Sequence, residues 1–151
     1  MPKCVQKIIK WCHELKEVDL TCDKGLNFDN LEFLVENIPP NIEKLKIGNS
    51  LLFHEEHIEI LLHRCNKIKT LSVEVITDRS LKMIRQYLNL TLEELSLSLK
   101  FLWLTSFLQL KSMPRLTILN LNCRKEDAKK IQYLRQHLPH LKINVFEITS
   151  L

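Results

Sequence analysis

The segment His54-Glu55-Glu56-His57 is the densest group of possible metal ligands in the chain, and His63 follows in the same predicted helix. Imidazoles three residues apart can share one helix face, as a metal site requires. Zinc metalloprotease helices instead place two histidines four residues apart around a glutamate, so this spacing does not match that chemistry. We interpret the segment as the solvated start of a helix, where acidic side chains are stabilised by the positive end of the helix dipole. We therefore predict no metal site.

The cysteines are the next candidates for chemistry. The chain has five, with no CxxC motif and no signal peptide before them, so we expect reduced thiols and a location in the cytoplasm or nucleus. Cys12 and Cys65 occupy the same position of the repeat described below, and we expect both to pack in the interior as small hydrophobic residues. Cys22 and Cys123 follow predicted strands and are expected to be more exposed. None is predicted to be a nucleophile.

Other catalytic and ligand-binding classes find no support in the sequence. Glu93 and Glu94 are adjacent in a predicted strand, so they point to opposite faces and cannot flank one bond. Only Gly25 and Gly48 are glycines, which excludes a glycine-rich phosphate loop. The net charge is only +4, and the basic residues alternate with acidic ones along the chain, whereas a nucleic-acid-binding surface has its basic residues clustered. No apolar stretch reaches the roughly 20 residues of a membrane span. We therefore predict no enzyme activity, no cofactor, no nucleic-acid partner and no membrane partner.

A repeat of about 25 residues organises the chain. Its pattern is apolar, two variable, apolar, one variable, apolar, and the first positions lie 24 to 27 residues apart. The copies are Leu15, Val18, Leu20; Ile42, Leu45, Ile47; Ile68, Leu71, Val73; Leu92, Leu95, Leu97; Leu116, Leu119, Leu121; and a degraded sixth at Leu141, Ile143, Val145. Between them the apolar spacing changes to about 3.6, as at Leu81, Ile84 and Leu88, which indicates amphipathic helices.

This period and pattern are typical of leucine-rich repeats, so we predict one α/β domain over residues 1–151 with about six helix–strand units. A single unit cannot bury its apolar side alone, and stacking the units buries a continuous core. The expected fold is a leucine-rich-repeat solenoid: a curved right-handed stack with a parallel sheet on the concave side and helices on the convex side.

Because side chains alternate along a strand, the residues between the repeat positions should face the concave surface. We predict that this surface binds a protein partner, with an acidic first strand, a basic second strand and small hydroxyls in the middle. The candidate binding residues are Glu17, Asp19, Lys44, Lys46, Thr70, Ser72, Glu74, Glu94, Ser96, Ile118, Asn120 and Asn122. The same alternation adds Thr21, Gly48, Ser98, Lys142, Asn144 and Phe146 to the face.

A cluster around Phe101, Trp103 and Phe107 is denser in apolar residues than one helix face needs. Two interpretations stay open: a second, exposed contact patch, or bulky core residues in an irregular segment between two strands. Trp11, at the end of the first predicted helix, is expected to take part in packing at the N-terminal end.

The cysteine three residues before the strand pattern, the strands LKEVDL and LEELSLS, and the helix opening ITDRSLKMI resemble the cysteine-containing leucine-rich repeats typical of F-box substrate receptors of cullin-RING ubiquitin ligases. The segment LPHLKIN, from Leu138 to Asn144, resembles the last repeat of the S-phase kinase-associated F-box receptors. The resemblance implies that the partner on the concave face is a substrate for ubiquitin-dependent degradation.

The same resemblance leaves two functional hypotheses. F-box receptors carry an adaptor-binding three-helix module before their repeats, but the first repeat helix here is predicted within a few residues of Met1. We therefore expect the recognition repeats without the F-box, either as a fragment or isoform of a longer receptor or as a stand-alone repeat protein, and no binding of the ligase adaptor. The alternative is an F-box-less leucine-rich-repeat scaffold or assembly factor, of the kind that builds mitochondrial complexes or regulates mitotic exit. The mitochondrial version should begin with an Arg-rich leader, which is not visible.

Overall fold

Helices and strands alternate along the whole described part of the chain. The structure is a computed structural model, and it describes residues 3–21, 28–48, 54–73, 77–98 and 103–147. Its elements are α1 (Lys3–Trp11), β1 (Glu17–Asp19), α2 (Phe28–Asn37), β2 (Lys44–Ile47), α3 (Glu55–Arg64), β3 (Thr70–Val73), α4 (Asp78–Leu88), β4 (Glu94–Ser98), α5 (Leu104–Phe107), the 3₁₀ helix η2 (Leu108–Ser112), β5 (Ile118–Cys123), the 3₁₀ helix η3 (Lys125–Asp127), α6 (Ala128–His137) and β6 (Lys142–Glu147).

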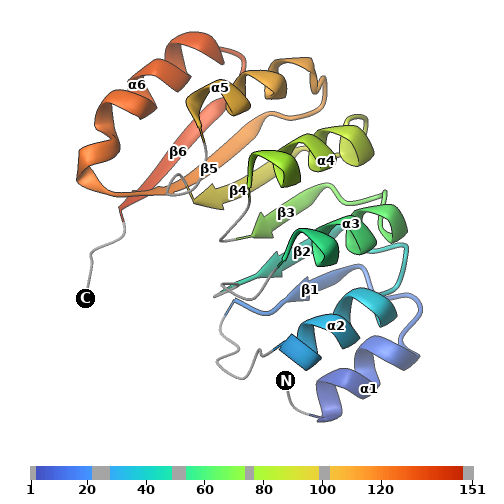
Figure 1. The fold of residues 1–151 in the computed structure, drawn as a ribbon. Coiled ribbons are helices and arrows are strands. Elements are labelled where there is room, and N and C mark those ends of the chain that lie inside the picture. Colours follow the sequence, from blue (N-terminus) through green and yellow to red (C-terminus); the bar gives the residue numbers. More distant parts are fainter. Residues whose placement is uncertain (1–2, 22–27, 49–53, 74–76, 99–102, 148–151) are drawn as a thin grey trace.

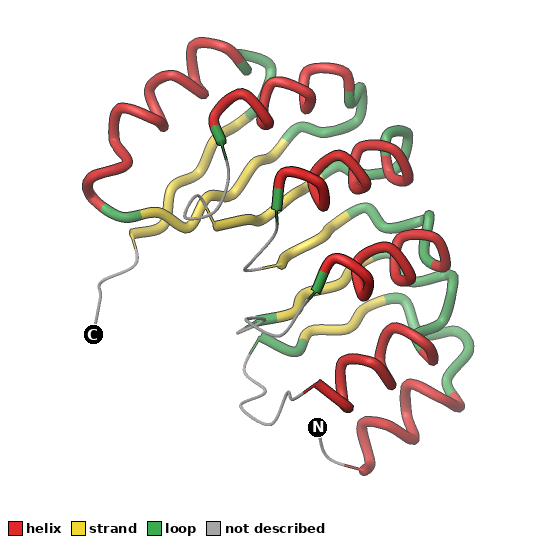
Figure 2. The backbone as a smooth tube through the Cα atoms, viewed as in Figure 1, coloured by secondary structure: helices red, strands yellow, loops and turns green. Residues whose placement is uncertain are grey.

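The six strands form one parallel sheet in chain order, from β1 to β6. Figure 1 shows that the units follow a curve, with the strands along its inner side and the helices along its outer side. The tube in Figure 2 shows the same two layers, one of strands and one of helices. Each helix returns the chain to the start of the next parallel strand, as a parallel sheet requires. The sheet therefore has one face covered by the described helices and an opposite face, on the concave side, that none of them covers.

A recurring backbone contact sets the register between neighbouring units. The amides of Glu43 and Lys44 both donate to the carbonyl of Lys16, at 2.8 and 3.0 Å. The same two-to-one arrangement recurs at each of the next three steps, where Lys69 and Thr70 donate to Glu43, Glu93 and Glu94 to Lys69, and Thr117 and Ile118 to Glu93. Each strand consequently starts level with its neighbour, and equivalent residues of successive units come to lie side by side.

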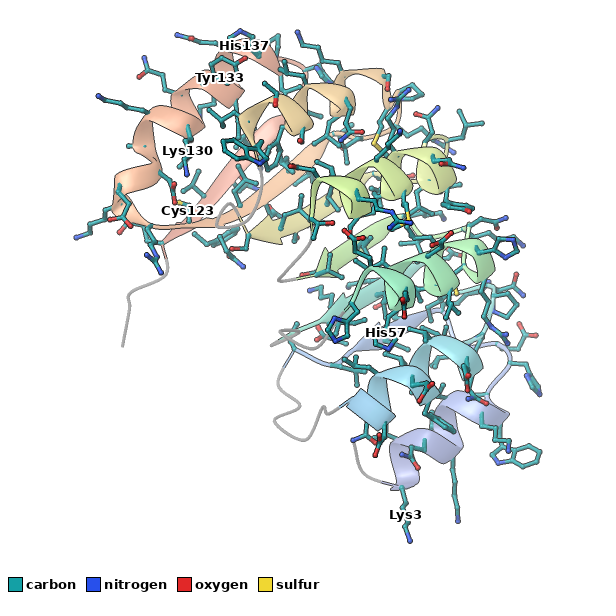
Figure 3. The ribbon with its side chains drawn as sticks, viewed as in Figure 1. Lys3, His57, Cys123, Lys130, Tyr133 and His137 are labelled. Atoms are coloured by element: carbon teal, nitrogen blue, oxygen red, sulfur yellow. The ribbon has the colours of Figure 1, made fainter. Side chains whose placement is uncertain are left out.

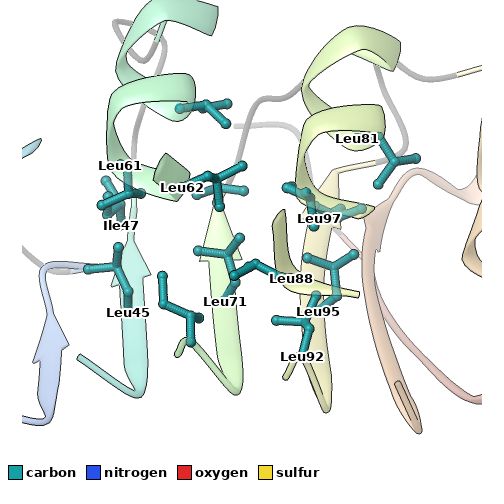
Figure 4. Packing of buried hydrophobic residues seen from close by; sticks show 14 of the residues in the cluster. Leu45, Ile47, Leu61, Leu62, Leu71, Leu81, Leu88, Leu92, Leu95 and Leu97 are labelled. Atoms are coloured by element: carbon teal, nitrogen blue, oxygen red, sulfur yellow. The ribbon is translucent and has the colours of Figure 1, made fainter. Parts of the chain in front are cut away.

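The apolar residues of the repeat fill the space between the sheet and the helices. Leu71, Leu95 and Leu119 are almost completely buried and lie opposite one another in the register of β3, β4 and β5. Helix residues such as Leu61 and Leu88 are buried in the same core, and Figure 4 shows them beside strand residues such as Leu45 and Leu71. The predicted inward positions of the strands are therefore confirmed. Burial of these side chains, about 1.5–3 kcal/mol each, is the main stabilising contribution in such a core.

The segment between β4 and β5 is irregular, and this decides one of the open interpretations. Only four residues form α5 before the chain tightens into η2, and Phe107 at that junction is fully buried. The expectation that Phe107 belongs to an exposed contact patch is thus wrong, because its ring fills the core beside this short helix. Trp103 remains 74% exposed, and its amide donates to Asp78 at the start of α4. Phe101 lies outside the described residues.

Three further expectations about burial are corrected at the ends of the elements. Cys12 is exposed, and Trp11 is 70% exposed, because α1 packs against α2 on one side and against no other described helix beyond it. Cys65 is buried as predicted, but Cys123 is buried as well, since β5 extends to this residue and its side chain points to the helices. Cys22 lies outside the described residues.

Gly48, directly after β2, lies where a neighbouring backbone segment leaves no space for a side chain. A Cβ atom added there would lie 2.6 Å from the carbonyl oxygen of Thr21, which belongs to the preceding unit. Glycine is therefore required by close approach of two chain segments. Among the helices that the structure describes, none is long and apolar enough to cross a membrane.

Candidate protein-binding face

The open face of the sheet carries its side chains in three rows that cross the strands. The register defines the first row as Glu17, Lys44, Thr70, Glu94, Ile118 and Lys142, and the second row as Asp19, Lys46, Ser72, Ser96, Asn120 and Asn144. The third row contains Ser98, Asn122 and Phe146. The candidate binding residues predicted from strand alternation thus lie together on one face, except Glu74, which is outside the described residues. Ser98 is an exception in burial, because only 6% of it is exposed.

Ion pairs between neighbouring strands neutralise the N-terminal half of this face. The ammonium nitrogen of Lys44 lies 3.3 Å from a carboxylate oxygen of Glu17, and that of Lys46 lies 3.7 Å from Asp19. The pKa of Asp19 is lowered, first by the Thr21 hydroxyl at 2.6 Å, then by the Thr21 amide, with Lys46 adding to the effect. The predicted acidic and basic strands therefore compensate each other, and their charges on this face are paired.

The centre of the face is formed by short polar side chains on β3. Thr70 and Ser72 are half-buried, and neither side chain hydrogen-bonds to another of the described residues. Each hydroxyl can donate one hydrogen bond and accept up to two. A partner can therefore approach the backbone of the sheet closely here and find unused polar groups.

A chain of side-chain amides crosses the C-terminal half of the face. The amide nitrogen of Asn120 donates to a carboxylate oxygen of Glu94 at 2.6 Å and to the Ser96 hydroxyl at 3.0 Å. The Asn120 oxygen accepts from the amide nitrogen of Asn144 at 2.8 Å. All of these groups are partly buried. Their hydrogen bonds therefore join the three strands β4, β5 and β6 and hold the bonded side chains in one geometry. The sequence placed these residues on one face but gave no sign that they are bonded.

The strand β6 adds two exposed side chains to this half. Lys142 begins the strand and is exposed, and Phe146 near its end is 53% exposed. Ile118, next to Lys142 in the first row, is half-buried. The C-terminal half thus combines apolar, amide and charged groups, a mixture that suits recognition of a protein surface.

A second network follows the edge where the strands start. Glu43 lies between two lysines, 3.4 Å from Lys16 and 2.6 Å from Lys69. The hydrogen bond and the charge of Lys69 lower the pKa of Glu43, and the same contact raises the pKa of Lys69. These side chains link three units along the rim of the face, and sequence reasoning missed them because they lie one position outside the strands.

Among the described residues, those first considered for chemistry do not come together in a reactive site. His57 is buried, its Nδ1 accepts the amide of His54 at 3.2 Å, and desolvation followed by the charge of His54 lowers its pKa. Burial raises the pKa of Cys65 to about 11, which disfavours the thiolate. Within the described ranges, no group of three or more His, Cys, Asp or Glu side chains could hold a metal ion. Figure 3 shows His57 and Cys123 far apart along the stack.

No family model matches the chain, and no curated protein sequence matches it significantly.

Proposed function

We propose that this chain is a leucine-rich-repeat solenoid that binds a protein partner on its concave face, as the substrate-recognition repeats of an F-box-type receptor in ubiquitin-dependent degradation. The observation that carries the binding role is the open face of the sheet. Its outward side chains are polar or half-exposed over six strands, and no described helix covers them. A stack of units of this kind offers an extended concave surface, which repeat proteins use for binding.

The ubiquitin-ligase role has separate support. It depends on the resemblance of the strands LKEVDL and LEELSLS and of the segment from Leu138 to Asn144 to repeats of F-box receptors. The spacing of the units fits that class, since equivalent residues such as Leu71 and Leu95 lie 24 positions apart in the chain and opposite each other in the sheet. Binding without catalysis suits a face on which Asn120 and its partners hold one another, while Thr70 and Ser72 make no hydrogen bond to other described residues.

The binding face can be tested by blocking its centre. Thr70→Arg with Ser72→Arg places two large side chains on β3, where the native side chains make no hydrogen bond to other described residues. The matched control is Gln86→Arg with Gln136→Arg, which adds the same two charges to exposed positions of α4 and α6. Immobilised wild-type chain and both double variants are incubated with cell extract, and the bound proteins are compared by quantitative mass spectrometry.

We expect the β3 variant to lose the bound partners and the helix control to retain them, at equal melting temperatures. Retention by the β3 variant together with loss by the control would move the binding surface to the helices and refute the proposal.

The degradation role needs a second experiment with the same variants. The described helices α1 to α6 each belong to a helix–strand unit, so we expect the chain by itself not to bind the ligase adaptor. Fused behind an adaptor-binding F-box, the wild-type chain should direct ubiquitination of the recovered partner in a reconstituted reaction, and the β3 variant should not. If the partner binds the chain but is never ubiquitinated in the fusion reaction, the degradation role is refuted and the binding role stands.

A further inference from the structure

We propose that the C-terminal half of the concave face, over β4, β5 and β6, binds a partner helix that carries an apolar side chain between a basic and an acidic one. The basic side chain lies over Glu94, the apolar one over Ile118 and the acidic one over Lys142. This inference rests on the proposed binding role of the concave face and names the chemistry of the partner.

The distribution of paired charges selects this half of the face. In the first row, Glu17 and Lys44 are 3.3 Å apart and already neutralise each other. Glu94 and Lys142 belong to the same row, and neither forms an ion pair with any of the described residues. A partner gains attraction at an uncompensated charge, whereas at an ion pair it must compete with the existing contact.

Glu94 is held in position for such a contact. One of its carboxylate oxygens accepts from Asn120 at 2.6 Å, and Asn120 is in turn bonded to Ser96 and Asn144. An amide donor fixes the carboxylate without neutralising its charge. The second carboxylate oxygen accepts no hydrogen bond from the described residues, so it can receive a basic side chain from a partner.

Ile118 separates the two charges. The register places it opposite Glu94 on one side and opposite Lys142 on the other, and it is the one apolar residue of the first row. It is half-buried, so part of its surface is available for contact. The order across the three strands is thus acidic, apolar, basic, and a complementary partner carries basic, apolar and acidic groups in that order.

The spacing of the strands favours a helix as the partner. Neighbouring strands lie about 4.8 Å apart, so Glu94 and Lys142 are separated by about 9.6 Å at the backbone. Side chains on one face of a helix repeat about every 5.4 Å, which gives about 10.8 Å over two turns. In an extended chain the side chains on one face repeat at about 6.7 Å, which gives about 13 Å over two steps. The helix matches the two-strand span more closely, with its contact residues at i, i+3 or i+4, and i+7.

A displayed library of Ala-based helical peptides, randomised at i, i+3, i+4 and i+7, tests the inference. Selection on the wild-type chain should enrich one basic and one acidic residue at i and i+7, in either order because the helix can lie in both directions, with an apolar residue between them. Lys142→Glu leaves two acidic groups and should enrich basic residues at both ends. Glu94→Lys leaves two basic groups and should enrich acidic residues at both ends.

Matched controls separate this inference from the proposed function. Lys129→Glu makes the same charge change as Lys142→Glu on exposed α6 and should leave the wild-type pattern unchanged. A peptide selected on wild type should bind Lys142→Glu at least about fivefold more weakly, as expected when an exposed attraction becomes a repulsion. Melting curves establish whether each variant folds. If Glu94→Lys does not fold, the result for Lys142→Glu decides the test.

Absence of any enriched peptide, or the same charge pattern on all variants, would overturn the inference. Peptides without this pattern whose binding is lost with Thr70→Arg and Ser72→Arg would overturn it as well, while the proposed concave-face function would stand. Peptides without this pattern that bind regardless of the Thr70→Arg and Ser72→Arg changes would contradict both.

Discussion

The amide of Asn120 is expected to contribute measurably to the stability of the C-terminal half of the sheet. Its side chain makes three hydrogen bonds, to Glu94 at 2.6 Å, to Ser96 at 3.0 Å and from Asn144 at 2.8 Å. Intramolecular hydrogen bonds contribute about 0.5–1.5 kcal/mol each, and more when one partner is charged. The partners of Asn120 are only partly buried and recover water when it is removed, so we expect Asn120→Ala to lower the free energy of unfolding by about 1–2 kcal/mol.

Asn122→Ala provides a matched control. Asn122 lies two residues further along β5 on the same face, is also half-buried, and its side chain bonds to none of the described residues. Its removal should change the stability by less than about 0.5 kcal/mol, as for ordinary surface positions. In equilibrium urea unfolding, followed by circular dichroism, a slope of about 2 kcal/mol/M converts the expected loss for Asn120→Ala into a midpoint shift of about 0.5–1 M. Equal midpoints for the two variants would refute the reasoning.

A charge variant of the same residue tests the contact with Glu94 directly. Asn120→Asp places a second carboxylate beside Glu94, so at least one of the two pKa values should rise in the folded state. A carboxyl group with a raised folded pKa contributes stability below its unfolded value, and that contribution is lost as the pH rises through the folded value. The destabilisation relative to wild type should consequently be larger at pH 7 than at pH 4. A difference that is independent of pH would show that the two side chains do not interact.

Three further predictions concern other parts of the chain. Gly48→Ala should cost about 1–3 kcal/mol in urea unfolding, because its Cβ would meet the Thr21 carbonyl at 2.6 Å; an unchanged midpoint would contradict that close approach. Iodoacetamide at pH 8 should label exposed Cys12 in the native protein and Cys65, buried and with a pKa of about 11, only after unfolding, as followed by mass spectrometry. Because the pKa of His57 is lowered in the folded state, the unfolded chain binds a proton more readily than the folded one. The stability that His57 contributes should therefore be full above pH 6.5, the ordinary pKa of histidine, and fall as the pH drops toward the pKa of the folded state. His57→Gln should weaken this dependence of stability on pH, and an equal pH dependence in the variant and the wild type would refute the prediction.

The strands and their two faces could be predicted from the sequence because they depend on local alternation. Leu71 and Leu95 recur at a fixed spacing, and the residues between them have to point the other way. The register between units follows from the same spacing, since each unit adds nearly the same number of residues. The α/β class, the six units and the positions on the open face were therefore accessible without coordinates.

The remaining features depend on contacts between units, which a single repeat does not reveal. The ion pair of Lys44 with Glu17 and the bonds of Asn120 join residues 24 to 27 positions apart, and they were not predicted although the repeat length places the partners side by side. For Phe107 the sequence left two interpretations open, an exposed contact patch or a core residue in an irregular segment. The change from α5 to η2 at this residue alters which side chains share a face, and its ring enters the core.

The central claim, that the concave face is the binding surface, is tested most directly by photo-cross-linking from defined positions. A benzophenone amino acid is incorporated at Asn122, on the open face of β5, or at Gln86, exposed on α4, and each variant is irradiated in cell extract. The concave-face proposal predicts partner cross-links from position 122 and none above background from position 86. Cross-links from position 86 alone, or from neither position, would contradict it.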